Sequence, residues 1–173
     1  LTLCVIGAVS WLTSADLVRA LRRSEEETRK AKAFNARLEY LAHFDELTGL
    51  ANRAAMRLRF EQAAALAERN RGRVALLYLD LDHFKHINDA MGHPIGDELL
   101  KAMAQRFQSV VRRSDPVGRL GGDEFLVLLT DVGDHDALAD VALKLLRQIE
   151  AAEPVNGLDM AVTASMGIAV FPQ

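Results

Sequence analysis

The segment GRLGGDEFLVLLT, residues 118–130, has the pattern of a strand, a tight turn and a second strand. Gly121, Gly122 and Asp123 are placed at the turn, because glycine adopts positive φ at little cost and lets a ligand approach the backbone. The apolar residues that follow the turn are typical of a strand buried in a sheet. The sequence therefore predicts a β-hairpin with two acidic side chains, Asp123 and Glu124, at its turn.

The segments on either side of this hairpin alternate between helical and strand patterns. A nearly continuous apolar run, VALLYLDL (74–81), predicts a buried central strand. Amphipathic helices are expected over 53–69, 96–111 and 135–151, and a last strand over 161–171. The order helix, strand, helix, hairpin, helix, strand predicts an α/β (α+β) fold with one mixed sheet covered by helices.

Asp80 and Asp82 lie at the carboxyl end of the central strand. Alternate residues of a strand point to the same face, so both carboxylates are expected on one side of the sheet. If the hairpin pairs with this strand, Asp80 faces Asp123 and Glu124, and carboxylates that close raise one another's pKa unless a cation neutralises them. Each acid alone is more often a solvated turn residue. As a set, the acids predict a site for Mg²⁺ or Mn²⁺.

Composition narrows the class of protein. Of the 173 residues, 50% are hydrophobic and 26% are charged, which is typical of a globular chain. The net charge of −3 does not suggest the basic face of a duplex-binding protein, so no nucleic acid partner is expected. Cys4 is the only cysteine, which excludes an intrachain disulfide and a cysteine-based zinc site.

The first 44 residues divide into an apolar segment and a long polar helix. Residues 1–13 are interpreted as the truncated end of a transmembrane helix that leaves the membrane on the cytoplasmic side, because arginines and lysines follow it. A buried helix end or a signal-peptide core are the alternatives. Residues 14–44 lack proline and glycine and predict a linker helix, either a solvated connector or a weak parallel coiled coil.

Four motifs occur in order over residues 45–173 and carry a resemblance to a known family. RLGGDEF (119–125) resembles the signature of GGDEF domains, the diguanylate cyclases of bacteria. DELTGLANR (45–53), LDLDHFKHIND (79–89) and GHPIGDELL (92–100) resemble its other conserved blocks. The resemblance implies a fold like nucleotide cyclases and polymerase palms, and the condensation of two GTP into cyclic di-GMP and pyrophosphate. It also implies a homodimer and two metal ions per active site. Relative to the family, the chain is expected to lack a C-terminal helix and strand.

The resemblance assigns roles to individual residues. It implies metal ligands at Asp80, Leu81 (through its carbonyl), Asp123 and Glu124, and catalytic roles for Asp123, Glu124 and Lys85. The implied substrate-binding residues are Asn88 and Asp97 for the guanine, with Phe84, Gly121 and Gly122 near the nucleotide. An amide and a carboxylate suit guanine, which offers both donors and an acceptor.

Arg112 and Asp115 have RxxD spacing before the signature. This pair is a common surface ion pair, but the resemblance implies an inhibitory site for the cyclic di-GMP product, to which Lys144 is a further candidate. For Arg119 two roles stay open, a structural role and a role in the inhibitory site. His83 and His86 are interpreted as non-ligands.

These interpretations place the catalytic domain in the cytoplasm, at the inner face of the plasma membrane. The competing hypothesis is a catalytically inert module that binds cyclic di-GMP or GTP and regulates a neighbouring domain.

Overall fold

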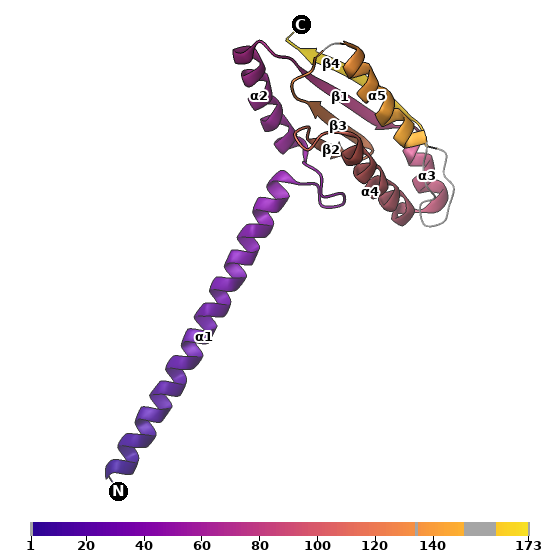
Figure 1. The fold of residues 1–173 in the computed structure, drawn as a ribbon. Helices are drawn as coiled ribbons and strands as arrows, with labels where there is room; N and C mark the ends of the chain where they lie inside the picture. Colours follow the sequence, from indigo (N-terminus) through magenta and orange to yellow (C-terminus); the bar gives the residue numbers. More distant parts are fainter. Residues whose placement is uncertain (1, 134, 151–161, 173) are drawn as a thin grey trace. The chain divides into compact units, whose positions relative to one another are not determined.

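The computed structural model describes residues 2–133, 135–150 and 162–172, with side chains from residue 18 onward and without that of residue 150. It divides into two units, residues 1–40 and 41–173. The first unit is helical, and the second holds the sheet and the remaining helices (Figure 1).

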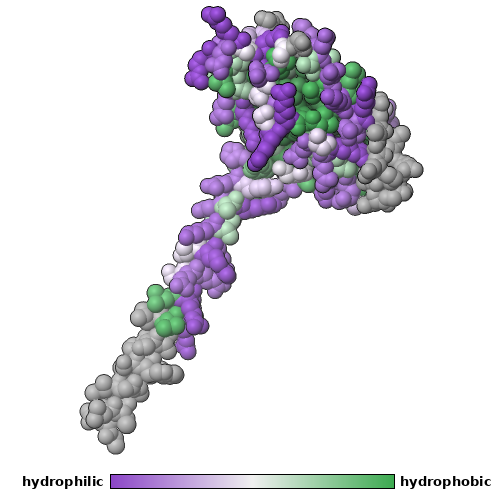
Figure 2. All heavy atoms as spheres, viewed as in Figure 1, coloured by the Kyte–Doolittle hydropathy of each residue, from purple (hydrophilic) through white to green (hydrophobic). Residues whose placement is uncertain are grey.

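Helix α1 spans Thr2–His43, so it covers the predicted linker helix and begins earlier. Its described side chains are exposed, including Leu21, Phe34 and Leu38, and mostly hydrophilic atoms line it in Figure 2. Lys30 pairs with Glu26 at 2.8 Å, one turn apart. Among the described residues, no helix combines the length and the apolar composition needed to cross a bilayer. The side chains of the proposed membrane segment, residues 1–13, lie outside the described residues.

The second unit confirms the predicted order of elements and adds one short helix. In chain order its elements are α2 (Arg53–Asn70), β1 (Val74–Leu81), α3 (Phe84–Met91), α4 (His93–Val110), β2 (Val117–Gly121), β3 (Glu124–Leu129), α5 (His135–Glu150) and β4 (Ala164–Phe171). Helix α3 was not predicted, and α4 begins three residues before the expected start. Asn52 caps α2 by accepting a hydrogen bond from the amide of Ala55.

The strands form one sheet in the order β2-β3-β1-β4, and each neighbouring pair is antiparallel. A mixed sheet was expected, but the parallel component among the described residues is a single bridge between Ala51 and Gly118. The reason lies in the helical connections. The strands that helices join, β1 with β2 and β3 with β4, do run parallel, but in each case an antiparallel strand is inserted between them, as in split βαβ units.

Helices cover both faces of this sheet (Figure 1). On one face, α4 and α5 pack on the sheet around Leu77, Leu79 and Phe125, which are fully buried. The rings of Phe107 on α4 and Phe125 on β3 meet edge to face at 5.2 Å. On the other face, α2 packs through Met56 against a smaller apolar cluster. These layers hold the carboxyl end of β1 and the β2–β3 turn side by side.

Candidate functional site

The acidic residues gather where β1 ends beside the β2–β3 turn. Asp80 on β1 lies directly opposite Glu124 on β3 in the antiparallel register. The amide of Leu81 donates a hydrogen bond to the carbonyl of Asp123 at 3.3 Å, which ties the turn to the strand. Directly opposite residues of an antiparallel pair share a face. The backbone therefore places Asp80 next to Asp123 and Glu124, as the sequence predicts.

The side chain of Glu124 is held by two partners that the sequence did not point to. Arg53, at the start of α2, pairs with Glu124 at 3.1 Å. The Tyr78 hydroxyl also donates a hydrogen bond to Glu124; together with burial and the charges of Glu124 and Asp80, this bond raises the pKa of Tyr78 to about 12. Tyr78 precedes Asp80 by two residues on β1, so both face the same side of the sheet.

The pKa of Asp80 is raised above its ordinary value. Burial is the largest cause, followed by the negative charges of Asp123, Glu124 and Asp82. Asp82 behaves differently, because the hydroxyls of Thr163 and Ser165 donate hydrogen bonds to it at 2.7 and 2.8 Å and lower its pKa. Asp82 therefore links the end of β1 to β4. At Asp80, by contrast, the neighbouring negative charges disfavour the ionised form of the carboxyl.

Whether the acidic corner formed by Asp80, Asp123 and Glu124 fits a divalent cation depends on which ligand atoms it offers and on where they point. Carboxylates and a backbone carbonyl are the hard oxygen ligands that Mg²⁺ prefers, and a cation would relieve the repulsion around Asp80. Within the described part of the chain, however, no three acidic, histidine or cysteine side chains already converge as a metal site. Glu124 is turned toward Arg53 and Tyr78. The residue types fit a hard cation, and one oxygen of Glu124, Oε2, is paired with Arg53.

Arg119 fastens the glycine turn. Its guanidinium donates to the carbonyl of Gly122 at 2.9 and 2.6 Å and pairs with Asp45 at 3.0 Å. Gly122 has a φ of 54°, and Gly121 of 139°, so both positions favour glycine for conformation. Burial alone would raise the pKa of Asp45, but hydrogen bonds from Thr48 and Arg119 outweigh it and lower that pKa. Of the two roles open for Arg119, these contacts support the structural one.

Asn88 on α3 presents an unpaired acceptor next to α4. Its Oδ1 atom is buried and has no hydrogen-bond partner among the described residues. Gly96 makes this approach possible, because a Cβ there would lie 2.0 Å from Oδ1 of Asn88. The next residue, Asp97, is exposed. A buried carbonyl oxygen without a donor is rare and calls for an explanation such as a ligand.

The start of α3 holds Phe84 and Lys85. The Phe84 ring is buried in the core, so only its backbone is available to a ligand, whereas the Lys85 side chain is exposed. The first amides of a helix have no intrahelical acceptor and favour anions. His83 and His86 stack on one another with ring centroids 5.5 Å apart, and their interpretation as non-ligands stays a prediction.

The RxxD residues do not form the ion pair that their spacing permits. Asp115 is buried, and its Oδ1 accepts hydrogen bonds from the amide and hydroxyl of Thr130, both at 2.9 Å. Arg112, Asp115 and Lys144 line one small cavity of about 210 Å³. The structure therefore brings the three candidates for an inhibitory site together, while giving Asp115 a structural contact as well.

Sequence reasoning did not foresee the contacts of Arg53 and Tyr78 with Glu124. Arg53 is separated from Glu124 by 71 residues, so no local pattern pairs them. The sequence did contain a signal for Tyr78. Tyr78 precedes Asp80 by two residues on a strand, so its hydroxyl must lie on the same face of the sheet as the Asp80 carboxylate.

Comparisons with known proteins agree with this architecture. A family model described as "Diguanylate cyclase, GGDEF domain" matches residues 42–173. MucR of Pseudomonas aeruginosa, a bifunctional diguanylate cyclase/cyclic di-GMP phosphodiesterase, is 40% identical over 99% of the chain, which spans 25% of MucR's length.

Two solved structures share the fold. The GGDEF domain of TpbB from Pseudomonas aeruginosa has 37% identity and a TM-score of 0.71, covering 75% of this chain and 76% of that one. The coiled coil and GGDEF domain of DgcB from Caulobacter crescentus, in complex with c-di-GMP, has 27% identity and a TM-score of 0.73, with coverage of 89% and 82%.

Proposed function

Because the chain belongs to the GGDEF-domain diguanylate cyclase family, we propose that residues 45–173 belong to an active diguanylate cyclase. The reaction condenses two GTP molecules into cyclic di-GMP with release of two pyrophosphates. In each half-reaction the 3′-hydroxyl of one GTP attacks the α-phosphorus of the other, the bond to pyrophosphate breaks, and the hydroxyl gives up its proton.

The observation that carries the proposal is the register of Asp80 against Glu124 beside the glycine turn. Asp80, Asp123, Glu124 and the Leu81 carbonyl would hold two Mg²⁺ or Mn²⁺ ions. When bound, the cations neutralise phosphate charge and lower the pKa of the attacking hydroxyl. The open space beside Gly121 and Gly122 allows a nucleotide to approach the backbone there. Asp123 is also the candidate to assist deprotonation of the hydroxyl.

Substrate recognition is assigned to α3 and to the start of α4. The Asn88 side-chain amide and the exposed Asp97 carboxylate are suited to the donors and the acceptor on the guanine edge. The first amides of α3, at Phe84 and Lys85, together with the Lys85 ammonium, would bind the triphosphate. An adenine base offers no N1–H, so these acceptors select guanine.

Catalysis requires two nucleotide-loaded domains to meet, and α1 is proposed to supply the dimer contact as a coiled coil. Its exposed Leu21 and Leu38 lie at the heptad positions expected for such a seam. Pairing raises the effective concentration of one domain near the other. Membrane attachment through residues 1–13, with the domain at the cytoplasmic face, stays part of the proposal, as does product inhibition through Arg112 and Asp115.

The direct test supplies GTP and Mg²⁺ to a polypeptide that continues past Gln173 and measures cyclic di-GMP. We expect product from the parent protein and none from Glu124→Gln. Glu61→Gln is the matched control, because Glu61 is an exposed acid paired only with Arg57 on α2. Folded protein that makes no product at high concentration would contradict the cyclase proposal.

One observation favours the inert binding module as a second candidate. Glu124 is paired with Arg53, and in a site that does not turn over this pair would persist. That candidate predicts tight binding of cyclic di-GMP that Arg112→Ala abolishes, with no turnover of GTP.

A further inference from the structure

Asp82 is held by three hydrogen bonds where β1 ends. Its backbone amide donates to the carbonyl of Thr163 at 2.9 Å. Its carboxylate accepts from the hydroxyls of Thr163 and Ser165 at 2.7 and 2.8 Å, each on a different oxygen. The next residue, His83, turns the chain with a φ of 59°. These contacts therefore continue the link to β4 beyond the strand pairing, which ends at Leu81.

The same bonds set the direction of the Leu81 carbonyl. The N–H and the C=O of a trans peptide group point in opposite directions. Because the Asp82 amide points to Thr163 beside β4, the Leu81 carbonyl of that peptide group points away from β4. The amide of Leu81 donates to Asp123 on the other side, and both backbone groups of a residue in an antiparallel strand face the same neighbour. The Leu81 carbonyl is therefore directed toward the β2–β3 turn, which carries the candidate metal ligands Asp123 and Glu124.

The hydroxyl of Ser165 is directed at Asp82 and not at Asp80. Ser165 lies directly opposite Asp80 in the register of β1 and β4, yet it donates its hydrogen bond to Asp82. Burial and neighbouring negative charges raise the pKa of Asp80, and no hydrogen bond from a described side chain opposes them. Because the hydroxyl is committed to Asp82, both carboxylate oxygens of Asp80 are left for a cation.

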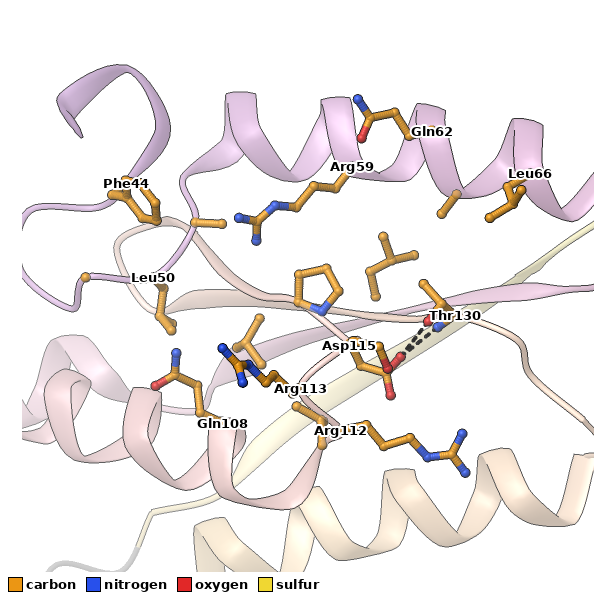
Figure 3. A pocket seen from close by; sticks show the side chains of 18 residues that line it. Phe44, Leu50, Arg59, Gln62, Leu66, Gln108, Arg112, Arg113, Asp115 and Thr130 are labelled. Atoms are coloured by element: carbon orange, nitrogen blue, oxygen red, sulfur yellow. Dashed lines mark hydrogen bonds between the residues drawn. The ribbon is translucent and has the colours of Figure 1, made fainter. Parts of the chain in front are cut away.

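These contacts are separate from the candidate inhibitory site. The largest cavity in the described part of the chain, about 820 Å³, lies between α2 and the turn from α4 into β2, and Arg112 and Asp115 line it (Figure 3). Neither Asp82 nor Thr163 nor Ser165 lines this cavity or the smaller one beside α5. Substitutions at Thr163 and Ser165 therefore act on the acidic corner and not on the inhibitory site.

We propose that the hydroxyls of Thr163 and Ser165 are positioning groups for the divalent cation of the acidic corner, and that they act through Asp82. They direct the Leu81 carbonyl at the cation and leave the Asp80 carboxylate free to bind it. Removing hydrogen bonds that orient metal ligands typically lowers metal affinity about 10–100-fold. The inference rests on the proposed function, because the cation belongs to the cyclase site, but it concerns metal affinity and not turnover.

The test follows the Leu81 carbonyl by NMR. A polypeptide that continues past Gln173 is isotopically labelled at leucine carbonyl carbons and aspartate nitrogens, so that each Leu–Asp peptide group gives its own signal. The signal that disappears in Asp82→Asn identifies the Leu81 carbonyl. Mg²⁺ is then added without nucleotide, and the shift of this signal gives the metal affinity. We expect Mg²⁺ to shift the Leu81 signal of the parent protein.

Thr163→Val and Ser165→Ala each remove one hydroxyl at an exposed position. We expect the double variant to bind Mg²⁺ about tenfold more weakly, with a smaller shift of the Leu81 signal. Thr163→Ser keeps a hydroxyl, so its Mg²⁺ affinity should stay within about twofold of the parent. Ser109→Ala is the matched control, because the exposed Ser109 hydroxyl donates to the carbonyl of Arg106 on α4, and it should leave Mg²⁺ binding unchanged. Loss of the fold would instead move the signals of all Leu–Asp groups.

Three results would overturn the inference. One is a Leu81 signal that does not respond to Mg²⁺ at concentrations on the order of 10 mM. Another is unchanged Mg²⁺ affinity in the folded double variant. The third is an equal loss of affinity in Thr163→Ser or Ser109→Ala, since the effect would then not come from the hydroxyls that bind Asp82.

Failure of the cyclase proposal gives a different result. A polypeptide that makes no cyclic di-GMP, but shows the Leu81 shift and its loss in the double variant, contradicts turnover and supports the positioning role. An active cyclase whose double variant binds Mg²⁺ as the parent does contradicts the positioning role alone.

Discussion

Replacing Arg119 by alanine removes the side chain that holds the Gly121–Gly122 turn through hydrogen bonds and an ion pair. The side chain is only 11% exposed where it pairs with Asp45, and it donates twice to the carbonyl of Gly122. Hydrogen bonds of charged groups contribute about 1.5–3 kcal/mol each and do not add fully. Asp45 keeps its bonds from Thr48, so the expected loss in free energy of unfolding is about 3 kcal/mol.

Urea unfolding measures this loss. With an m-value near 2 kcal/mol/M, the midpoint of Arg119→Ala is expected to fall by about 1.5 M with m unchanged. Arg113→Ala is the control: this exposed arginine has no ion pair among the described residues, so its expected effect is within about 0.5 kcal/mol. In a double-mutant cycle, Asp45→Asn should couple to Arg119→Ala by about 1 kcal/mol or more. A loss below about 0.5 kcal/mol for Arg119→Ala, or strict additivity in the cycle, would refute the role of Arg119 in holding the turn.

Two further predictions concern Tyr78 and Gly96. The Tyr78 phenol should ionise near pH 12 in an absorbance titration, with Tyr78→Phe identifying the transition, and Glu124→Gln should lower its pKa; a pKa unchanged in that variant would contradict the hydrogen bond. Because this folded-state pKa lies above the ordinary 10.0, the contribution of Tyr78 to stability is complete below pH 10 and is lost as the pH rises through about 12. Gly96→Ala should displace Asn88, since the new Cβ would lie 2.0 Å from its Oδ1. We expect a loss of about 1–3 kcal/mol in urea unfolding together with weaker GTP binding, and full GTP affinity in this variant would contradict the assignment of Asn88.

The strands of the second unit could be predicted because their apolar runs are continuous and flanked by turn residues. The register that sets Asp80 opposite Glu124 follows from pairing β1 with the hairpin, which the sequence suggested but could not establish. The insertion of antiparallel strands between those joined by helices could not be predicted. A helical connection fixes the relative direction of two strands but does not make them neighbours.

The sequence predicted which residue types form the site better than it predicted where their side chains point. Helix α3 escaped prediction because it is only 8 residues long, too short to show a helical period. The acids were expected to converge on a cation, yet Glu124 is drawn toward Arg53 and Tyr78. Such competition depends on side chains that are distant in sequence, and no periodic pattern encodes it.

Calorimetric titration of GTP, with Mg²⁺ and again with EDTA, tests the role of the acidic corner most directly, in a folded polypeptide that continues past Gln173. The affinity is expected to be at least about tenfold higher with Mg²⁺, and Asp80→Asn should remove this difference while Glu61→Gln preserves it. Equal GTP affinity with and without Mg²⁺, or a magnesium effect that survives Asp80→Asn, would contradict a cation held at Asp80 beside the glycine turn.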